Sequence, residues 1–151
     1  SVTANTTPSK DFFSDKSLYL LRNKSKKGVG FFDVHGFYPD FLVWVVVGTK
    51  QYITFVDPKG ITRLRSFDDP KIQLANVIRN EIEPRLNDSD VVLNSFIISN
   101  TPIQAVSHWV GFDEKALFTE KDMKVFNERH VYFQYEQSET YIKDMLLQIL
   151  R

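Results

Sequence analysis

The strongest constraint on the fold is an uninterrupted apolar run, Phe41–Val47, followed at once by Gly48-Thr49 and a second strand-like segment, residues 50–56. Valine and aromatic side chains fill the run, and both favour extended strands. A glycine at the first position of a two-residue connection suits a tight hairpin. Because the run is apolar at every position, both faces of its strand should be covered, which predicts a central sheet with helices packed over it.

Caps and periodicity predict the remaining elements. Asp69 and Pro70 suit the cap and first turn of a helix whose apolar spacing continues until Pro84 disrupts it. Ser14 suits the cap of an earlier helix over residues 15–23. Further elements are expected as strands over residues 30–34, Val91–Ser99 and 130–135, and as an amphipathic helix over residues 138–150. This order predicts an α/β fold, in which one central mixed sheet is flanked by helices.

Length and composition indicate a single globular domain. The chain has 151 residues, 42% of them hydrophobic and 25% charged, which is ordinary for a folded soluble protein. The Ser/Thr/Asn-rich residues 1–10 are interpreted as a linker or boundary segment before one domain over residues 11–151. There is no cysteine, which excludes disulfides and thiolate metal sites. No apolar run reaches membrane-spanning length and no signal-peptide core is present, so a cytoplasmic location is expected.

The charge balance restricts how the chain could use nucleic acid. Nineteen Lys and Arg residues balance nineteen Asp and Glu residues, so the net charge is zero. A stand-alone DNA-binding protein would be expected to be basic. Neutrality counts less against a domain whose partner domains hold the nucleic acid. The three histidines are too scattered to form a zinc site, and no Gly-rich phosphate loop indicates an ATPase.

Two acidic residues flank the predicted hairpin. If Val47 pairs with Lys50, antiparallel pairing places Asp40 opposite Asp57, with Cβ atoms about 5 Å apart. Lys59 then emerges on the same face as Asp57. Facing carboxylates repel each other unless a cation lies between them, and oxygen ligands favour a hard ion such as Mg²⁺. Lys59 could then stabilise a phosphate's negative charge or orient water, although a surface ion-pair cluster would satisfy the same spacing.

Four strings around these residues match a known family pattern: residues 18–23 (LYLLRN), 28–32 (GVGFF), 37–41 (FYPDF) and 56–60 (VDPKG). Together they resemble the PD-(D/E)XK nucleases. The resemblance is in particular to the C-terminal endonuclease domain of the restriction (helicase-nuclease) subunit of type III restriction enzymes. The resemblance implies a restriction-endonuclease-like core and Mg²⁺- or Mn²⁺-dependent endonuclease cleavage of double-stranded DNA in a restriction-modification system. It also implies a helicase-like motor on the same parent chain and a separate modification (methyltransferase) subunit.

The same resemblance assigns roles to individual residues. Asp40 and Asp57 are expected to be metal ligands, with the carbonyl of Pro58 as a third, and Lys59 is expected to be the catalytic lysine. Asp33 is an auxiliary candidate, because the acidic ligand that many relatives carry on the first helix has no convincing counterpart here. Gln73 is a second auxiliary candidate, although Val77 stands where some relatives have a tyrosine.

Basic residues offer candidate contacts to phosphate. Lys24, Lys26 and Lys27 form a basic loop that is interpreted either as DNA-contacting or as a solvated connection. Arg63, Arg65 and Lys71 could line a phosphate track, with a solvated surface as the default. Two other functions remain open: a non-catalytic DNA-binding or docking module of the same fold, and a repair exonuclease. Cleavage of both strands would also call for pairing of two nuclease domains.

Overall fold

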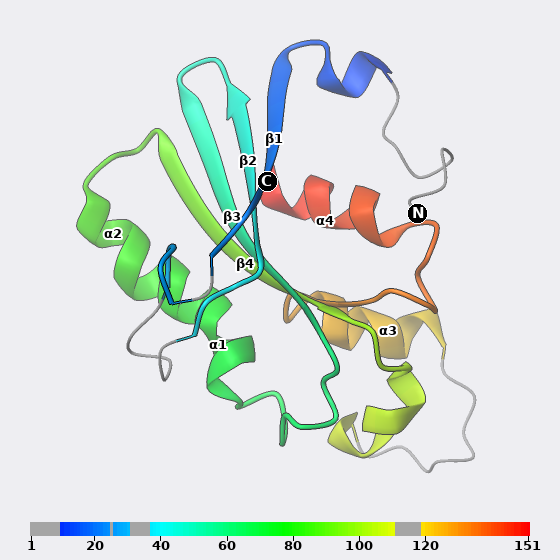
Figure 1. The fold of residues 1–151 in the computed structure, drawn as a ribbon. Helices are drawn as coiled ribbons and strands as arrows, with labels where there is room; N and C mark the ends of the chain where they lie inside the picture. Colours follow the sequence, from blue (N-terminus) through cyan, green and yellow to red (C-terminus); the bar gives the residue numbers. More distant parts are fainter. Residues whose placement is uncertain (1–9, 25, 31–36, 111–118) are drawn as a thin grey trace.

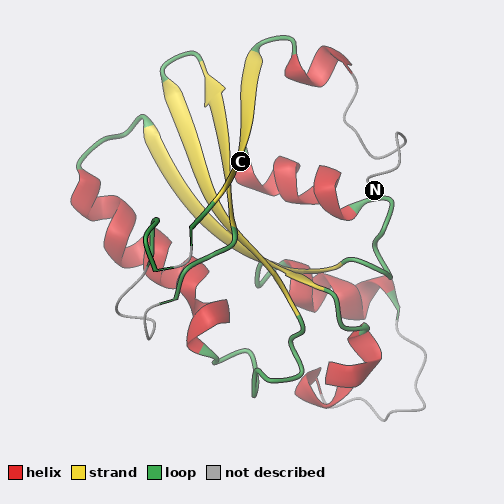
Figure 2. Cartoon of the chain, in the orientation of Figure 1, coloured by secondary structure: helices red, strands yellow, loops and turns green. Residues whose placement is uncertain are grey.

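The computed structural model describes residues 10–24, 26–30, 37–110 and 119–151, and shows one five-stranded sheet with helices on both sides (Figures 1 and 2). The first three strands are antiparallel neighbours, and the last two run parallel to the third, so the sheet is mixed. The strands lie in chain order: β1 Lys16–Arg22, β2 Phe41–Val47, β3 Lys50–Lys59, β4 Val91–Ser99 and β5 Val131–Phe133. The predicted α/β class with a central mixed sheet flanked by helices is confirmed.

The helices cover the sheet from two sides (Figure 1). The helical segments are η1 Lys10–Phe13, α1 Pro70–Val77, η3 Ile78–Ile82, α2 Glu83–Leu86, η4 Ile103–Val110, α3 Glu120–Asn127 and α4 Tyr141–Ile149. On one side, α4 packs over an apolar cluster that includes Val45, Phe96 and Met145. On the other side, α1 and η3 bury Leu74 and Ile78 against Phe55. The two sides of β3 therefore face different surroundings.

The hairpin predicted at Gly48-Thr49 forms between β2 and β3. Val47 pairs with Lys50, and the ladder runs on to the pair Phe41–Val56. Gly48 has a φ of 61°, which a glycine adopts without the steric cost that a Cβ would impose. The expectation that β2 is buried on both faces holds only in part, because Trp44 on the α1 side is half-buried. The helices on that side pack against β4 rather than β2, which leaves Trp44 partly open.

The helix predicted over residues 15–23 is wrong, because β1 occupies this segment. Its pairing with β2 includes Leu20 opposite Val43, and β1 forms the outer edge of the sheet. Leu18 and Leu21 on this edge strand are 43% and 46% exposed. A short apolar run does not distinguish helix from strand by periodicity, and the backbone groups at the open edge of β2 favour the strand. The strand expected over residues 30–34 falls mainly outside the described residues.

The helix predicted from Asp69 begins as expected. The Asp69 side chain accepts a hydrogen bond from the Lys71 amide at 2.9 Å, and Pro70 lies in the first turn. Pro84 does not end the helical path, since η3 widens into a π-helical turn and Pro84 lies in the first turn of α2. The strand expected over residues 130–135 is the shorter β5, because His130 has a φ of 62°. The last helix starts later than predicted, at Tyr141.

Candidate active site at the end of β3

Asp57 and Lys59 lie on the side of β3 that faces α1. Asp57 is 5% exposed, and its carboxylate forms an ion pair with the ammonium of Lys59. In the parallel ladder with β4, Asp57 is opposite Ile97 and Lys59 is opposite Ser99. The ladder with β2 has already ended at Val56, so this end of β3 has an open edge toward the segment that precedes β2.

Asp40 lies in that preceding segment, directly before β2. Its side chain is exposed, whereas its backbone amide lies close enough to the Asp57 carboxylate to act against the rise in that group's pKa. Burial raises the pKa of Asp57, the nearby negative charge of Asp40 raises it further, and the Lys59 ammonium opposes both. The structure therefore brings Asp40, Asp57 and Lys59 together, and a cation at this point would relieve the cost of the buried carboxylate.

Asn23 holds the turn that carries Asp40, a role that the sequence did not suggest. The Asn23 amide donates to the Asp40 carbonyl at 2.8 Å, and its side-chain nitrogen donates to the carbonyls of Pro39 at 2.8 Å and Val29 at 2.7 Å. A Cβ on Gly28 would lie 2.0 Å from Oδ1 of Asn23, so this position requires glycine. The end of β1, the loop after it and the Asp40 turn therefore form one hydrogen-bonded unit.

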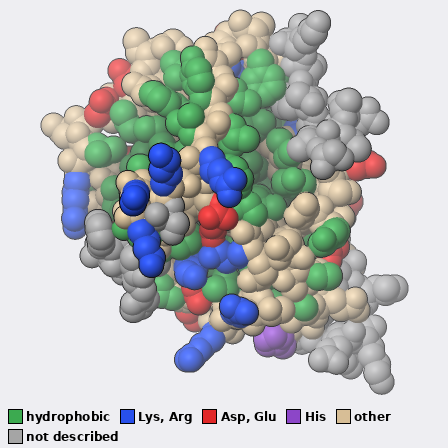
Figure 3. Space-filling model, in the orientation of Figure 1, with side chains coloured by type: hydrophobic (Ala, Val, Ile, Leu, Met, Phe, Trp, Pro, Cys, Tyr) green, Lys and Arg blue, Asp and Glu red, His purple; other side chains and the backbone are tan. Residues whose placement is uncertain are grey.

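The basic loop is part of this unit. Lys24, Lys26 and Lys27 are all exposed, and the loop is closed by a hydrogen bond of 2.7 Å from the Gly28 amide to the Lys24 carbonyl. The bonds of Asn23 tie the two ends of the loop to the turn that carries Asp40. Figure 3 shows Lys and Arg side chains gathered around a small acidic group on one face of the molecule. The three lysines therefore lie on a loop that Asn23 anchors to the turn carrying Asp40.

Lys71 also reaches this site, from the first turn of α1. The buried Phe37 ring has the Lys59 ammonium 4.8 Å from its centroid and the Lys71 ammonium 5.7 Å from it. Burial lowers the pKa of Lys71, the positive charge of Lys59 lowers it further, and the charge of Asp57 acts in the opposite direction. The sequence offered Lys71 only as a possible phosphate contact, with a solvated surface as the default. Its position beside Lys59 could not be predicted, because the path of α1 across the sheet was not known.

The auxiliary candidates differ in their placement. Gln73 is engaged at the start of α1, where its side chain donates to the Phe67 carbonyl at 2.8 Å and accepts from Asn76 at 2.8 Å. Asp33 lies outside the described residues. Asp15 pairs with Lys16 at the exposed start of β1. Pro58 lies between Asp57 and Lys59, so its backbone carbonyl is carried by the same stretch of β3.

The donor set at this site is small and consists of oxygen atoms. Within the described ranges, no group of three or more His, Cys, Asp or Glu side chains is arranged to hold a metal ion. The available ligands are the carboxylates of Asp40 and Asp57 and the carbonyl of Pro58. Hard divalent ions such as Mg²⁺ use few protein carboxylates and keep several waters. The buried, partly compensated charge of Asp57 fits such an ion better than it fits a soft metal.

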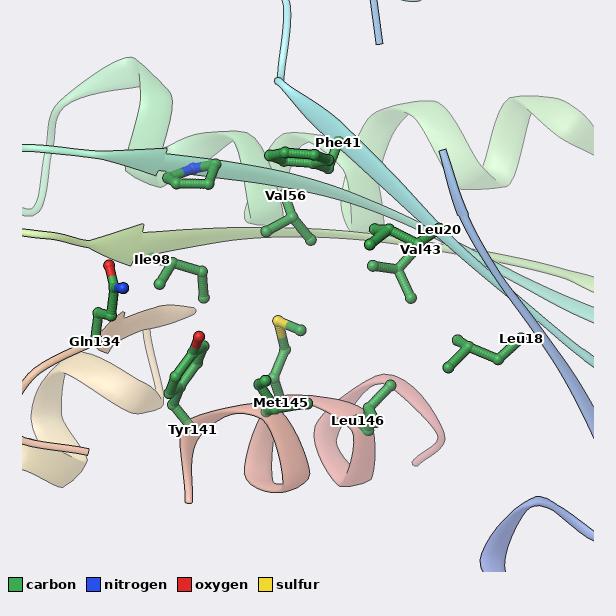
Figure 4. A pocket seen from close by; sticks show the side chains of 12 residues that line it. Leu18, Leu20, Phe41, Val43, Val56, Ile98, Gln134, Tyr141, Met145 and Leu146 are labelled. Atoms are coloured by element: carbon green, nitrogen blue, oxygen red, sulfur yellow. The ribbon is translucent and has the colours of Figure 1, made fainter. Parts of the chain in front are cut away.

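A separate cavity lies on the opposite side of the sheet, between β-strand side chains and α4 (Figure 4). Its volume is about 350 Å³. Val43, Val56 and Ile98 point into it from the sheet, and Met145 and Leu146 point into it from α4 (Figure 4). Among the described residues, its lining contains no charged side chain.

Comparison of the chain with models of protein families, with curated proteins and with solved structures gives no match. Among the helices of the described segments, none is long and apolar enough to cross a membrane. The function is therefore argued from the residues of the site and their geometry.

Proposed function

We propose that this chain is a Mg²⁺-dependent endonuclease domain that hydrolyses phosphodiester bonds of double-stranded DNA within a restriction-modification system. The observation that carries the proposal is the buried Asp57 carboxylate, which is paired with Lys59 and in contact with the Asp40 segment. A surface ion-pair cluster has no need to bury a carboxylate whose pKa is raised by burial and by a second acid.

The topology supports the resemblance to PD-(D/E)XK nucleases. Three antiparallel strands are followed by a helical segment and then by a parallel strand, β4. Pro39-Asp40 directly precedes β2, and Asp57-Pro58-Lys59 ends β3. This order is compatible with the restriction-endonuclease-like core that the resemblance implies, except that β1 occupies the segment where that core has its first helix. The motor domain, the modification subunit and the pairing of two nuclease domains belong to the same proposal.

The proposed roles follow from the donor chemistry. Asp40, Asp57 and the Pro58 carbonyl would hold a divalent ion, and such an ion would supply polarisation of the phosphodiester and activation of water. With Asp57 engaged as a ligand, the ammonium of Lys59 would donate to a phosphate oxygen. The negative charge on that oxygen grows as water attacks, so this donor is worth more in the transition state than in the ground state.

Asp57→Ala tests the proposal. We expect Mn²⁺ binding, measured by calorimetry, to be lost, and with it the Mg²⁺-dependent nicking of supercoiled plasmid. Metal binding is measured first because it does not depend on a motor to deliver DNA. Glu139→Ala is the matched control, since Glu139 is an exposed acid on the segment before α4 and should leave both readouts unchanged. Wild-type-like cleavage by Asp57→Ala would overturn the proposal.

The neutral charge of the chain favours a second candidate, a non-catalytic docking or DNA-binding module of the same fold. Such a module has no use for a metal, so absence of Mn²⁺ binding by the wild-type chain would favour it. A repair exonuclease would bind the metal but degrade linear DNA and spare closed circles.

A further inference from the structure

Two lysine ammonium groups share one aromatic ring beside the candidate active site. Lys59 reaches the buried Phe37 ring from the end of β3, and Lys71 reaches it from α1, at 4.8 Å and 5.7 Å from the centroid. The start of α1 is fixed by the Asp69 cap and by Pro70, so the position of Lys71 is set by the helix itself. The two cations are therefore held close together by elements that are distant in sequence.

Holding two like charges together in a partly buried place costs free energy. Within the part of the chain that the structure describes, Lys59 has an ion pair with Asp57, whereas Lys71 forms no salt bridge. The carboxylates of Asp57 and Asp69 attract Lys71, but from beyond ion-pair distance. The face of the Phe37 ring offers some compensation by cation–π attraction, which is weaker than an ion pair. Lys71 is therefore a second ammonium group beside the Asp57–Lys59 ion pair, with no ion-pair partner of its own among the described residues.

We propose that Lys59 and Lys71 form a two-point anion site that holds one phosphate group of the DNA backbone, with the Phe37 ring setting the spacing of the two ammonium groups. A phosphate carries two unesterified oxygens and can accept from two cations at once. Naming the anion as a DNA phosphate depends on the proposed nuclease function, whereas the anion site itself does not. Lys71 is thereby a substrate-binding residue contributed by α1.

The alternative role for Lys71 is structural, as a clamp that holds α1 on Phe37. Lys71→Met keeps the aliphatic stem that packs there and removes only the charge. Lys71→Arg keeps the charge and should rescue anion binding. Lys121→Met is the matched control, because Lys121 is the second residue of α3 as Lys71 is the second residue of α1, and it is exposed.

The experiment measures binding of a fluorescent DNA duplex by anisotropy, in Ca²⁺ to prevent cleavage, over a range of salt concentrations. We expect Lys71→Met to weaken binding roughly tenfold at low salt and to reduce the slope of log K against log salt by about one. Lys121→Met should bind like the wild type. A parallel calorimetric titration uses pyrophosphate, and there the same Lys71→Met variant should lose affinity.

The outcomes separate this proposal from the proposed function. If the chain binds pyrophosphate through Lys71 but binds no Mn²⁺, the anion site stands and the nuclease assignment fails. The opposite outcome has two parts: Asp57→Ala abolishes the Mn²⁺ binding of the wild type, and Lys71→Met binds duplex and pyrophosphate like the wild type. In that case the anion site is overturned and the nuclease assignment stands. Loss of thermal stability in Lys71→Met with unchanged affinity would assign Lys71 the clamp role. A wild-type chain that binds neither duplex nor pyrophosphate would overturn the anion site.

Discussion

The two faces of β3 differ in what buries them. Val56 and Asp57 are neighbours and are almost equally buried, at 6% and 5% exposure. Val56 lies in the apolar cluster under α4, whereas Asp57 meets the ammonium of Lys59 and the backbone of Asp40. Their side chains point to opposite faces of the sheet because successive residues of a strand alternate in direction. The degree of burial therefore does not indicate the role of a residue, whereas the chemistry of the groups packed against its side chain does.

The cavity on the α4 side and the site on the α1 side differ in the same way. The described residues that line the cavity under α4 are mostly apolar, and none of them is an ionic group that could orient a charged substrate (Figure 4). The site on the α1 side combines two carboxylates with the ammonium groups of Lys59 and Lys71. A phosphodiester is a charged substrate that needs oriented ionic partners, so the proposed substrate suits the α1 side rather than the α4 side. The α4 face should accordingly govern stability and the α1 face should govern reactivity.

The largest expected effect is on stability, from Phe96→Ala on the α4 side. Phe96 is 1% exposed and lies in the apolar cluster between the sheet and α4. Removing a fully buried phenyl group should lower the free energy of unfolding by about 3–5 kcal/mol. Urea denaturation measures this loss. Below the transition, Mn²⁺ binding should remain, because the proposed metal ligands Asp57 and Pro58 belong to the site on the other face.

Leu147→Ala is the control on the same side, because Leu147 is in α4 but 44% exposed. It should change the free energy of unfolding by less than about 0.5 kcal/mol. Loss of Mn²⁺ binding in folded Phe96→Ala would contradict the division between the two faces.

The sequence predicted those features that depend on local pairing. The hairpin at Gly48, the full span of β4 and the helix start at Asp69 follow from turn chemistry, apolar runs and capping, and all are confirmed. The closeness of Asp40 and Asp57 follows from the same hairpin register, since a two-residue turn fixes every pair along both strands. Metal ligation and catalysis at these residues stay predictions.

Features that depend on distant contacts could not be predicted. The segment of β1 has the same apolar letters as an amphipathic helix, and only the open edge of β2 makes it a strand. Asn23 bonds across sixteen positions to Pro39, and Lys71 meets Lys59 only because α1 crosses the sheet at that point. No local pattern in the sequence encodes either contact. Asn23 does end the string LYLLRN, which carries part of the family resemblance. That string gives no indication of the hydrogen bonds that Asn23 forms.

A second prediction concerns acid stability, and it again tests the α4 side. His130 is 7% exposed, stacks on Phe96 at 4.4 Å between ring centroids, and its Nδ1 lies 2.9 Å from the Ser95 carbonyl. Burial, aided by the charge of Arg79, lowers the pKa of His130 to about 4. The unfolded chain therefore takes up a proton as pH falls below about 6.5, while the folded chain does not until about pH 4.

The contribution of His130 to stability is thus complete above about pH 6.5 and is lost as pH falls toward 4. By pH 4.5 the loss should be about 2–3 kcal/mol. His130→Asn removes the titration and suits the positive φ at this position, because asparagine tolerates that conformation. Urea denaturation at pH 7.5 and 4.5 should show a smaller loss in the variant. Equal losses in the two proteins would show that His130 is not the group responsible.

The smallest effect on stability is expected from removing the central ion pair itself. A buried ion pair replaced on both sides by neutral groups of similar size typically costs little or stabilises the fold. The double variant Asp57→Asn with Lys59→Met should therefore unfold within about 1 kcal/mol of the wild type, or be slightly more stable. Mn²⁺ binding and cleavage should both be lost. Lys59→Met alone should be less stable than the double variant, because it leaves the Asp57 carboxylate buried without its partner. A double variant as unstable as Phe96→Ala would mean that the α1 face, too, is built for stability, and the contrast between the two faces of β3 would then fail.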